Sequence, residues 1–494
     1  MNNNLLLGFF YFTFSFFMFI FSGILVLGLR LELINFSTNI FKTDFFNSLT
    51  TLHGLIMIFG FLIPSFNGLC YWVIPYLLFY KNLFFLKSGF YFFFFLLFSS
   101  IFIIFSFFLP FGNLSSGWTL YTPLSIQSSF NIDFIIFSIY FLSFSTIFNS
   151  LNISLTILKF FKLSLLKMSI FLWSFLISSY LSLIVVPVLI GLITMIIFDK
   201  YFNTSFFNPV FKGDPVMYQH IFWFFGHPEV YIIILPSFGI TSQIVSVFTK
   251  KKIFSYSSMI YAIISISVVS LIVWGHHMFV SGVPFLAQSF FMYCTMLISI
   301  PTGIKVFNWI FTIWRGFLYF ETPFLFALGF IFFFIIGGFS GLLLSSAPLD
   351  IFYHGTYFVV AHFHYIMVSS SIFSIYSCWY YWSPVLFTVK FNAFRSKLHF
   401  WTTFLFLNFS FFPMHFLGFK GMPRRYFDYP VCYNFYNKFI TYNSFFLGFS
   451  QIYYFYFIFF PILCFNFFLL FLFFFFFYIF LFFFFLFFFY IFFF

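Results

Sequence analysis

The chain has 494 residues, of which 63% are hydrophobic and only 6% are charged. Soluble domains carry about 25% charged residues, so this composition excludes a large soluble core and indicates an integral membrane protein. The net charge of +12 does not indicate nucleic-acid binding, because no basic run is longer than 250–252 and the other cations are scattered between apolar stretches. The five cysteines contain no Cys-x-x-Cys pair, which argues against a disulfide framework or a zinc site.

Long apolar stretches cover most of the chain. A membrane-spanning helix needs about 20 apolar residues, and charges, Pro/Gly/Asn clusters and polar stretches separate twelve such spans. The predicted spans are 5–29, 51–78, 89–111, 131–157, 168–198, 218–249, 255–281, 285–307, 323–345, 357–386, 397–419 and 447–474. We therefore predict an all-α integral membrane protein with one twelve-helix bundle over 1–474. The polyaromatic stretch 475–494 would extend the last helix, add a short segment or lie at the membrane interface.

The distribution of Lys and Arg between the predicted loops indicates the topology. With the N-terminus inside, the inner loops carry twelve of these cations and the outer loops eight, while Lys305 lies within the eighth span. Because inner loops are typically the more basic, we predict that both termini lie on the inner side.

The placement of the histidines is unusual for a membrane protein. His53, His227, His276, His277, His362 and His364 all fall within predicted spans. Polar groups at membrane depth are costly and usually serve an interior function. One such histidine would be explained equally well by a hydrogen bond between helices. Six of them, without a matching set of buried carboxylates, favour metal and haem ligation.

The spacings of these histidines divide them into groups. Side chains two residues apart on a helix point to nearly opposite faces, so His362 and His364 would serve two different cofactors, both haems. His276 and His277 are adjacent, and with His227 they supply three imidazoles, which can hold copper and leave a position open for a substrate. A low-spin haem needs two axial ligands, and His53 is the remaining imidazole that can pair with His364.

Six motifs now resemble one family in order and spacing, over roughly residues 20–470. They are TLHGLIMIF (51–59), WFFGHPEVY (223–231), VWGHHMF (273–279), IPTGIKVFNW (300–309), VVAHFHY (359–365) and GMPRRYFDYP (421–430). This pattern resembles subunit 1 of the cytochrome c oxidases, in the haem–copper oxidase superfamily. The resemblance implies a bundle that encloses two haems and a copper. It implies these ligands: His53 and His364 for low-spin haem a, His362 for high-spin haem a3, and His227, His276 and His277 for copper B.

Two further side chains in the second motif suit the chemistry of oxygen reduction. Tyr231 follows His227 by four residues, so the two lie on one helix face, and its phenol could supply an electron and a proton. The alternative for an intramembrane tyrosine is packing, but its place one turn from a copper ligand favours the redox role. The resemblance also implies a covalent link between Tyr231 and His227. Glu229 would face the other way, and a carboxyl group buried there can transfer protons rather than only join two helices.

The resemblance implies roles for several more residues. A proton route from the inner side would use Ser242, Thr302, Lys305 and Tyr231. The alternative for Lys305 is that its side chain extends to the membrane interface, as lysines near helix ends commonly do. Arg424 and Arg425 match residues that neutralise haem propionates. Arg30 and Trp118 fall at family positions near the low-spin haem.

The chain departs from the family pattern at two places. The inner loop at 77–89 contains no Asp or Glu, whereas the family normally has an acid there that opens a proton route to Glu229. We expect Ser, Thr, Tyr and Asn side chains with water to carry protons to Glu229 instead. The outer motif keeps His354 as a magnesium ligand, but Gly355 replaces the expected Asp, so a magnesium ion would be held more weakly.

The sequence thus predicts the catalytic subunit of a terminal respiratory oxidase that reduces O2 to water and couples this to proton uptake and pumping. Phe makes up 110 residues, and Phe, Ile, Tyr and Asn have AT-rich codons, so we expect an organellar gene and the mitochondrial inner membrane. Implied partners are subunits 2 and 3, accessory subunits and cytochrome c, which docks on subunit 2.

Three other functions compete with this prediction. A nitric oxide reductase of the same superfamily is disfavoured, because that branch lacks a tyrosine corresponding to Tyr231. A quinol oxidase shares every motif, so the electron donor stays open. A transporter would suit twelve spans but gives no reason for six intramembrane histidines at these positions.

Overall fold

The computed structural model describes residues 3–38, 40–108, 114–127 and 130–459. In these ranges the regular elements are helices, and the only β pairing is an isolated bridge between Thr356 and Pro423. The predicted all-α membrane fold is confirmed. Within the described residues, ten helices are long and apolar enough to cross a membrane, so twelve spans are not fully shown.

The helices have the following bounds. The uninterrupted long helices are α1 (Asn3–Glu32), α4 (Leu86–Phe108), α6 (Asn131–Phe160), α7 (Ile170–Tyr201), α8 (Pro215–Phe248), α12 (Thr322–Ser345), α16 (Ala393–Phe419) and α17 (Asn434–Tyr454). Three further spans are composite: α2 (Thr43–Leu55) with α3 (Ile63–Leu77), α10 (Phe285–Leu297) with α11 (Ser299–Ile313), and α14 (Tyr357–Phe363) with α15 (Ser370–Phe387). The shorter helices are α5 (Leu124–Gln127), α9 (Tyr256–Ser270) and α13 (Ala347–Tyr353).

Two predicted boundaries were wrong. The twelfth helix begins at Asn434 rather than at 447, because polar residues in its first turns are buried against Arg30 instead of forming a loop. The predicted span 255–281 is not one helix, since α9 ends at Ser270 and a separate 3-10 segment follows at Trp274–Met278. The predicted tail 475–494 lies outside the described residues.

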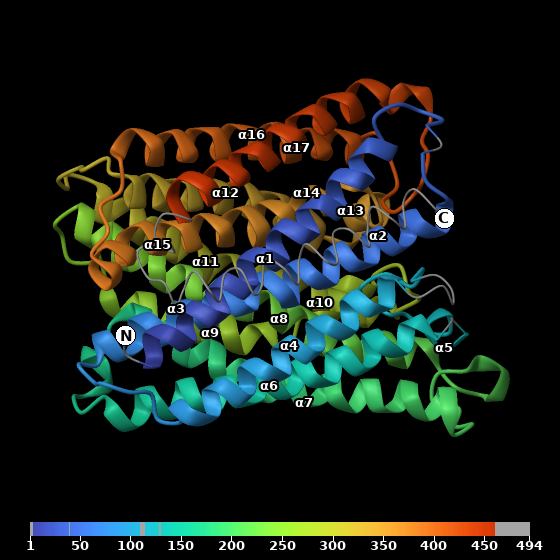
Figure 1. Cartoon of the computed structure of the whole chain (residues 1–494). Helices are drawn as coiled ribbons and strands as arrows, with labels where there is room; N and C mark the ends of the chain where they lie inside the picture. The colour runs from blue at the N-terminus through green and yellow to red at the C-terminus, as the bar shows by residue number, and fades with distance from the viewer. Residues whose placement is uncertain (1–2, 39, 109–113, 128–129, 460–494) are drawn as a thin grey trace.

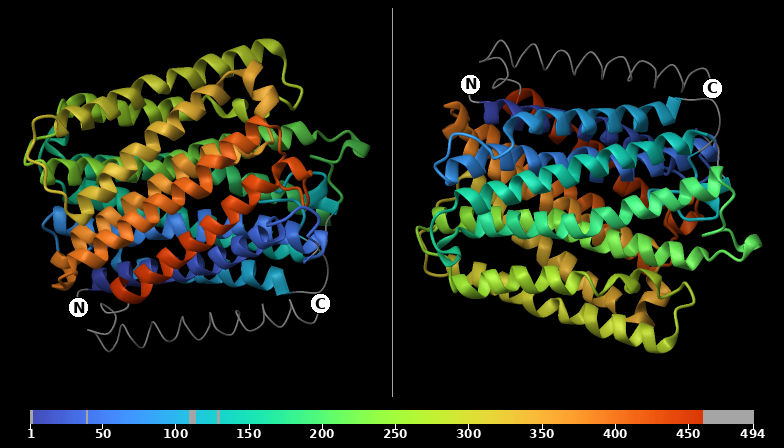
Figure 2. Two further views of the ribbon diagram at one scale, coloured as in Figure 1. Left: turned by 90° about the horizontal axis from the view of Figure 1, so that it is seen from above. Right: turned by 90° about the horizontal axis from the view of Figure 1, so that it is seen from below.

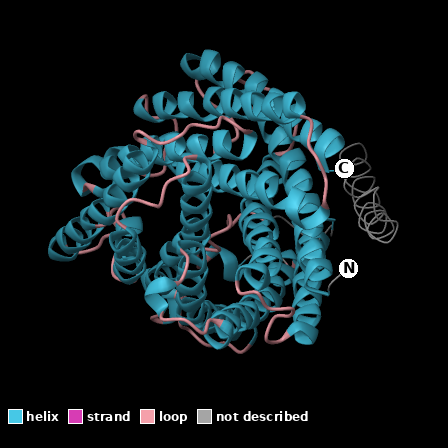
Figure 3. Ribbon diagram, turned by 90° about the vertical axis from the view of Figure 1, so that its left-hand side faces the viewer, coloured by secondary structure: helices cyan, strands magenta, loops and turns pink. Residues whose placement is uncertain are grey.

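The helices run side by side in a bundle, which Figure 3 shows end-on. Helices α16 and α17 pack together on one face, and α6 and α7 lie on the opposite face (Figures 1 and 2). Aromatic rings fill much of the interior; Phe12, for example, stacks on Trp379 with centroids 4.7 Å apart. A Cβ atom on Gly8 would lie 2.8 Å from the carbonyl oxygen of Gly68, so glycine lets α1 and α3 touch backbone to backbone.

The predicted inner loops gather at the end of the bundle where α1 begins (Figure 1). The amide of Asn4 donates to the carbonyl of Lys81 at 2.7 Å, which ties the start of α1 to the loop after α3. At the other end, Arg424 N donates to the carbonyl of Gly355 at 2.9 Å. This segregation agrees with the predicted loop assignment, while the orientation in the membrane stays a prediction.

Candidate metal and cofactor centre

A cavity of about 1150 Å³ occupies the interior of the bundle. Sites for single small molecules are typically roughly 300–1,000 Å³, so this cavity has room for more than one. The six histidines predicted as ligands all line it: His53, His227, His276, His277, His362 and His364. The structure thus brings these side chains, which come from separate segments of the chain, to one interior cavity.

Three of these imidazoles converge. The candidate ligand atoms of His227, His276 and His277 all lie within 4.8 Å of one another. His227 Nδ1 and His277 Nε2 are 3.3 Å apart, close to the separation of about 3.3 Å that tetrahedral geometry gives for metal–nitrogen bonds of about 2.0–2.1 Å. Among the described residues, this is the only group of three or more His, Cys, Asp or Glu side chains with metal-binding spacing.

Neighbouring side chains fix the orientation of this trio. The hydroxyl of Thr295 donates to the carbonyl of Phe291, so it can only accept from His276 Nδ1, which lies 3.0 Å away. That bond makes Nδ1 the protonated nitrogen and leaves the Nε2 lone pair of His276 for a metal. The indole of Trp223 stacks on His277, with centroids 4.0 Å apart and an interplanar angle of 12°.

The ring of Tyr231 lies beside this trio and lines the same cavity. Its centroid is 4.7 Å from that of His227, one turn earlier on α8. His227 Nε2 is buried without a hydrogen-bond partner among the described residues. The Tyr231 ring thus lies next to His227 in the cavity that the three imidazoles line.

The remaining three histidines share one bonding pattern. Each directs Nδ1 to a backbone carbonyl: His53 to Ser22 at 3.1 Å, His362 to Gly337 at 3.0 Å and His364 to Val360 at 2.8 Å. A carbonyl can only accept, so in each imidazole Nδ1 carries the proton and Nε2 keeps its lone pair for a ligand. Hydrogen bonding of this kind is typical of metal- and haem-binding histidines.

His362 and His364 serve different parts of the cavity. His362 ends α14 next to α12, where a Cβ atom on Gly341 would lie 2.8 Å from its Cε1. His364 begins a π-helical turn and stacks on Phe411 with centroids 4.3 Å apart. The π-helical turn, which the sequence did not predict, sets the direction of the second imidazole relative to the first.

Three arginines also face the cavity. Arg30 is buried and donates to Asn437 Oδ1 at 3.0 Å and to Thr441 Oγ1 at 3.2 Å. Burial lowers the pKa of Arg424, and burial together with the charge of Arg424 lowers the pKa of Arg425 to about 10. Both remain cationic at neutral pH, so the cavity offers positive charge to carboxylates such as those of a haem.

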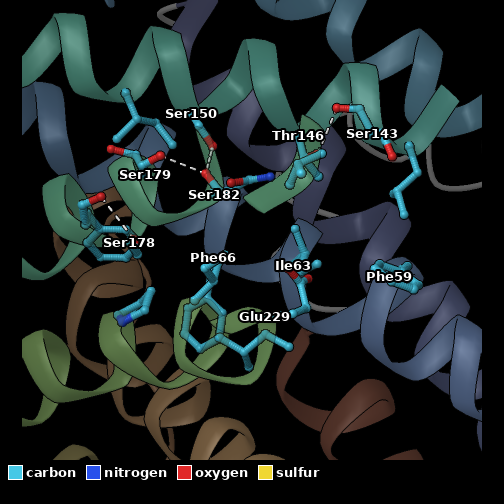
Figure 4. A pocket seen from close by; sticks show the side chains of 18 of the residues that line it. Phe59, Ile63, Phe66, Ser143, Thr146, Ser150, Ser178, Ser179, Ser182 and Glu229 are labelled. Carbon is cyan, nitrogen blue, oxygen red and sulfur yellow. Dashed lines mark hydrogen bonds between the residues drawn. The ribbon is translucent and has the colours of Figure 1, made fainter. Parts of the chain in front are cut away.

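Glu229 lines a second cavity, separate from the one that the histidines line. This cavity has a volume of about 60 Å³, which is enough for several water molecules. Figure 4 shows Glu229 beside Phe66, with seryl hydroxyls across the space. The polar lining consists of Glu229, Asn67, Ser143, Thr146, Ser150, Ser178, Ser179 and Ser182.

The predicted route through Lys305 is only partly assembled. Thr302 lines the central cavity with Tyr231. The ammonium group of Lys305 is buried without a hydrogen-bond partner among the described residues, 4.8 Å from the ring centroid of Phe238. Ser242 accepts from Trp309 Nε1 at 2.9 Å and donates to the carbonyl of Phe238 at 2.6 Å, so its hydrogen bonds are made to groups other than Lys305.

The candidate magnesium ligand His354 has one acidic neighbour, since its Nδ1 lies 3.1 Å from Asp350 Oδ2. Gly355 adopts a φ of +72°, and nothing lies within 4 Å of where its Cβ would be. Magnesium requires a near-octahedral set of oxygen ligands, and one carboxylate with one imidazole does not meet that requirement. The described residues of this chain alone therefore do not fit a magnesium ion.

Comparisons with known proteins bear directly on this geometry. Residues 6–452 match the family model described as cytochrome C and quinol oxidase polypeptide I. The chain belongs to this oxidase family. It is 42% identical over 417 residues to cytochrome c oxidase subunit 1 of Cereibacter sphaeroides, covering 83% of this chain and 74% of that protein. It is 40% identical over 423 residues to cytochrome c oxidase subunit 1 of Pecten maximus, covering 84% of this chain and 88% of that protein.

A solved structure of a haem–copper terminal oxidase dimer has the same fold, with a TM-score of 0.79. That match has 17% sequence identity and covers 92% of this chain and 83% of the other. Membership in the oxidase polypeptide I family implies haem and copper as cofactors. The convergent imidazoles and the buried guanidinium groups fit both kinds of group.

Sequence reasoning missed several residues that orient the site: Ser22, Thr295, Asp350, Tyr121 and Trp223. Asp350 had a detectable signal, because it precedes His354 by four residues on one helical turn. Thr295 and Tyr121 belong to other elements, and no local pattern places them beside their partners.

Proposed function

We propose that this chain is the catalytic subunit of a mitochondrial cytochrome c oxidase, an oxidoreductase that reduces O2 to water. The convergence of His227, His276 and His277 beside the phenol of Tyr231, in a cavity that is also lined by His53, His362 and His364, is the observation that carries this proposal. In this proposal haem and copper supply electron transfer and O2 binding, and the protein supplies their spacing, charge and proton access.

The imidazoles divide as their surroundings suggest. His227, His276 and His277 would hold copper B, His362 would hold haem a3, and His53 with His364 would hold haem a. In support, the candidate ligand atoms of the first three lie within 4.8 Å of one another, and each of the other three bonds Nδ1 to a backbone carbonyl. Arg30, Arg424 and Arg425, which line the same cavity, would pair with haem carboxylates, and Trp118 packs against Gly54, the residue after His53.

With the cofactors in place, Tyr231 would supply a proton and an electron from its phenol for the reduction of O2. The phenol is placed for this role because its ring centroid lies 4.7 Å from that of His227. The covalent link to His227 stays a prediction that the unpartnered Nε2 atom makes sterically reasonable.

Glu229 takes up protons through the hydroxyl-lined cavity. On the inner side of that cavity, Asn149 accepts from Tyr11 at 3.1 Å, and Asn152 Oδ1 accepts from the backbone of Phe85 at 2.9 Å in the loop after α3. These groups contain no carboxylate, in agreement with a relay built from neutral side chains and water. Lys305, Thr302 and Ser242 form the second route toward Tyr231.

Other subunits complete the enzyme. The α10–α11 pair is the least buried of the candidate spans in the described chain, with exposed Phe290, Tyr293 and Phe307. We assign this face to contacts with a neighbouring subunit such as subunit 2, through which cytochrome c delivers electrons; subunit 3 and accessory subunits cover other faces. The relatives named cytochrome c oxidase subunit 1 favour cytochrome c over quinol as the donor.

Oxygen consumption by the purified complex tests the proposal. With reduced cytochrome c as donor, we expect cyanide-sensitive uptake of O2. Turnover with a quinol but not with cytochrome c would identify the quinol branch of the family instead.

A further inference from the structure

The loop segment Gly117–Tyr121 contacts both candidate redox centres. On one side, the side chain of Trp118 lies against Gly54, the residue after His53: a Cβ atom on Gly54 would be 3.3 Å from Trp118 Cβ. On the other side, Tyr121 Oη accepts a hydrogen bond from Trp223 Nε1 at 2.6 Å. One short segment outside the spanning helices thus touches the surroundings of His53 and of His277.

The contact between Tyr121 and Trp223 determines how the indole lies on His277. An indole has a single hydrogen-bond donor, and in Trp223 that donor is directed to Tyr121. Because this hydrogen bond holds Nε1, the indole ring of Trp223 cannot rotate freely about its side-chain bonds. The indole face stays nearly parallel to His277, at the 12° angle between their planes.

Tyr121 is itself held from several directions. Its ring makes edge contacts with Tyr218 and Phe222, whose centroids are 6.1 Å and 6.4 Å away. Tyr218 donates to the carbonyl of Thr119 at 2.9 Å, which anchors the backbone of the segment to α8. Burial raises the pKa of Tyr121, so the phenol is neutral and available as an acceptor at physiological pH.

The segment also contacts Arg425, which lies in the loop between α16 and α17. A Cβ atom on Gly117 would lie 2.4 Å from Arg425 Nη1, so only glycine leaves room for the guanidinium group there. Gly117 has a φ of +71°, a backbone conformation that glycine adopts without strain. Arg425, the segment and Trp223 are therefore in continuous contact.

We propose that Tyr121 is a positioning residue for the metal trio: through Trp223 it fixes the tilt of the His277 imidazole. The proposal rests on the proposed function only in taking copper as the metal that His277 binds. A purely structural tyrosine would contribute packing at this site, and its hydroxyl would have no effect on the metal.

The test compares Tyr121→Phe with a matched control in the assembled, metal-loaded oxidase. The control is Tyr140→Phe, because the Tyr140 hydroxyl also forms a 2.6 Å hydrogen bond, to Thr194 Oγ1, on helices away from the cavity. The readout is the infrared stretching band of carbon monoxide held on copper after photolysis from haem. We expect a shifted and broadened band in Tyr121→Phe, with unchanged haem and copper content, and an unshifted band in Tyr140→Phe.

A second variant separates positioning from packing. Trp223→Phe keeps an aromatic face near His277 but lacks the indole donor, so it should shift the band and make a further Tyr121→Phe change silent. If Tyr121→Phe does not assemble, Trp223→Phe alone carries the test by the same band. A band in Tyr121→Phe or in Trp223→Phe identical to that of the unmodified enzyme would overturn the proposal. Absence of copper from the unmodified enzyme would instead reject the proposed function.

Discussion

The histidine-lined cavity and the hydroxyl-lined cavity of this bundle are built on opposite principles. In the first, His53, His362 and His364 are each fixed by a bond from Nδ1 to a backbone carbonyl, which leaves the lone pair of the other ring nitrogen available. In the second, Ser178 and Ser179 donate their protons to carbonyls of their own helix and leave only oxygen lone pairs toward the space. A metal site needs few, rigid donors, whereas a proton route tolerates many interchangeable ones.

Loss of an axial histidine should have the largest effect. His364→Leu or His53→Leu removes one of the two ligands proposed for low-spin haem, and the other four predicted ligand histidines are assigned to copper and to the second haem. We expect loss of that haem and of electron transfer, with copper retained, in optical spectra and metal analysis. His220→Leu, a histidine outside the six, is the control and should keep both haems. A normal low-spin spectrum in either variant would mean that the wrong histidines were paired.

Removal of the phenolic hydroxyl group of Tyr231 should have the second-largest effect. Tyr231→Phe preserves shape and burial but deletes the transferable proton, so turnover should fall by about 10²–10⁴-fold, the range typical of a lost general acid. Carbon monoxide should still bind the reduced enzyme. Oxygen consumption is the measurement, and a rate near that of the unmodified enzyme would reduce Tyr231 to a packing role.

Neutralising the acid of the hydroxyl-lined cavity should also suppress turnover. Glu229→Gln keeps the size of the side chain but cannot release a proton, whereas Glu321→Gln changes an exposed acid and serves as the control. Proton uptake and pumping in reconstituted vesicles are the readouts. If Glu229→Gln pumps normally, or if an experimental structure shows the cavity dry, Glu229 is structural and the Lys305 route carries the protons.

Removal of a single hydroxyl group from the hydroxyl-lined cavity should have the smallest effect on proton uptake. Ser182 forms a short hydrogen bond with Ser150 and lines the space together with Ser179. Since other hydroxyls and water can replace it, Ser182→Ala should slow Glu229-dependent proton uptake only severalfold. A block as complete as that of Glu229→Gln would show that the route is a single file of fixed groups, contrary to the contrast drawn above.

The same contrast explains what the sequence could predict. The candidate ligand histidines could be proposed because an imidazole at membrane depth is rare and its spacing is informative, and the all-helical fold followed from apolar runs. The start of α17 was missed because Asn437 and Thr441 look like loop residues until Arg30, more than 400 positions away, is placed against them. For the hydroxyl-lined cavity, the types of side chain were expected but their positions were not. Serine occurs throughout the chain, and no local pattern selects Ser150 or Ser182.

The central claim is that six intramembrane histidines hold two haems and one copper. Its most direct test is a reduced-minus-oxidised optical spectrum of the purified complex, with and without carbon monoxide, together with metal analysis. The account predicts two haem components per chain, of which only one binds carbon monoxide, and one copper that is lost in a His276→Leu, His277→Leu double variant while both haems remain. A complex without haem, with carbon monoxide bound to both haems, or with copper unaffected by that double variant would contradict it.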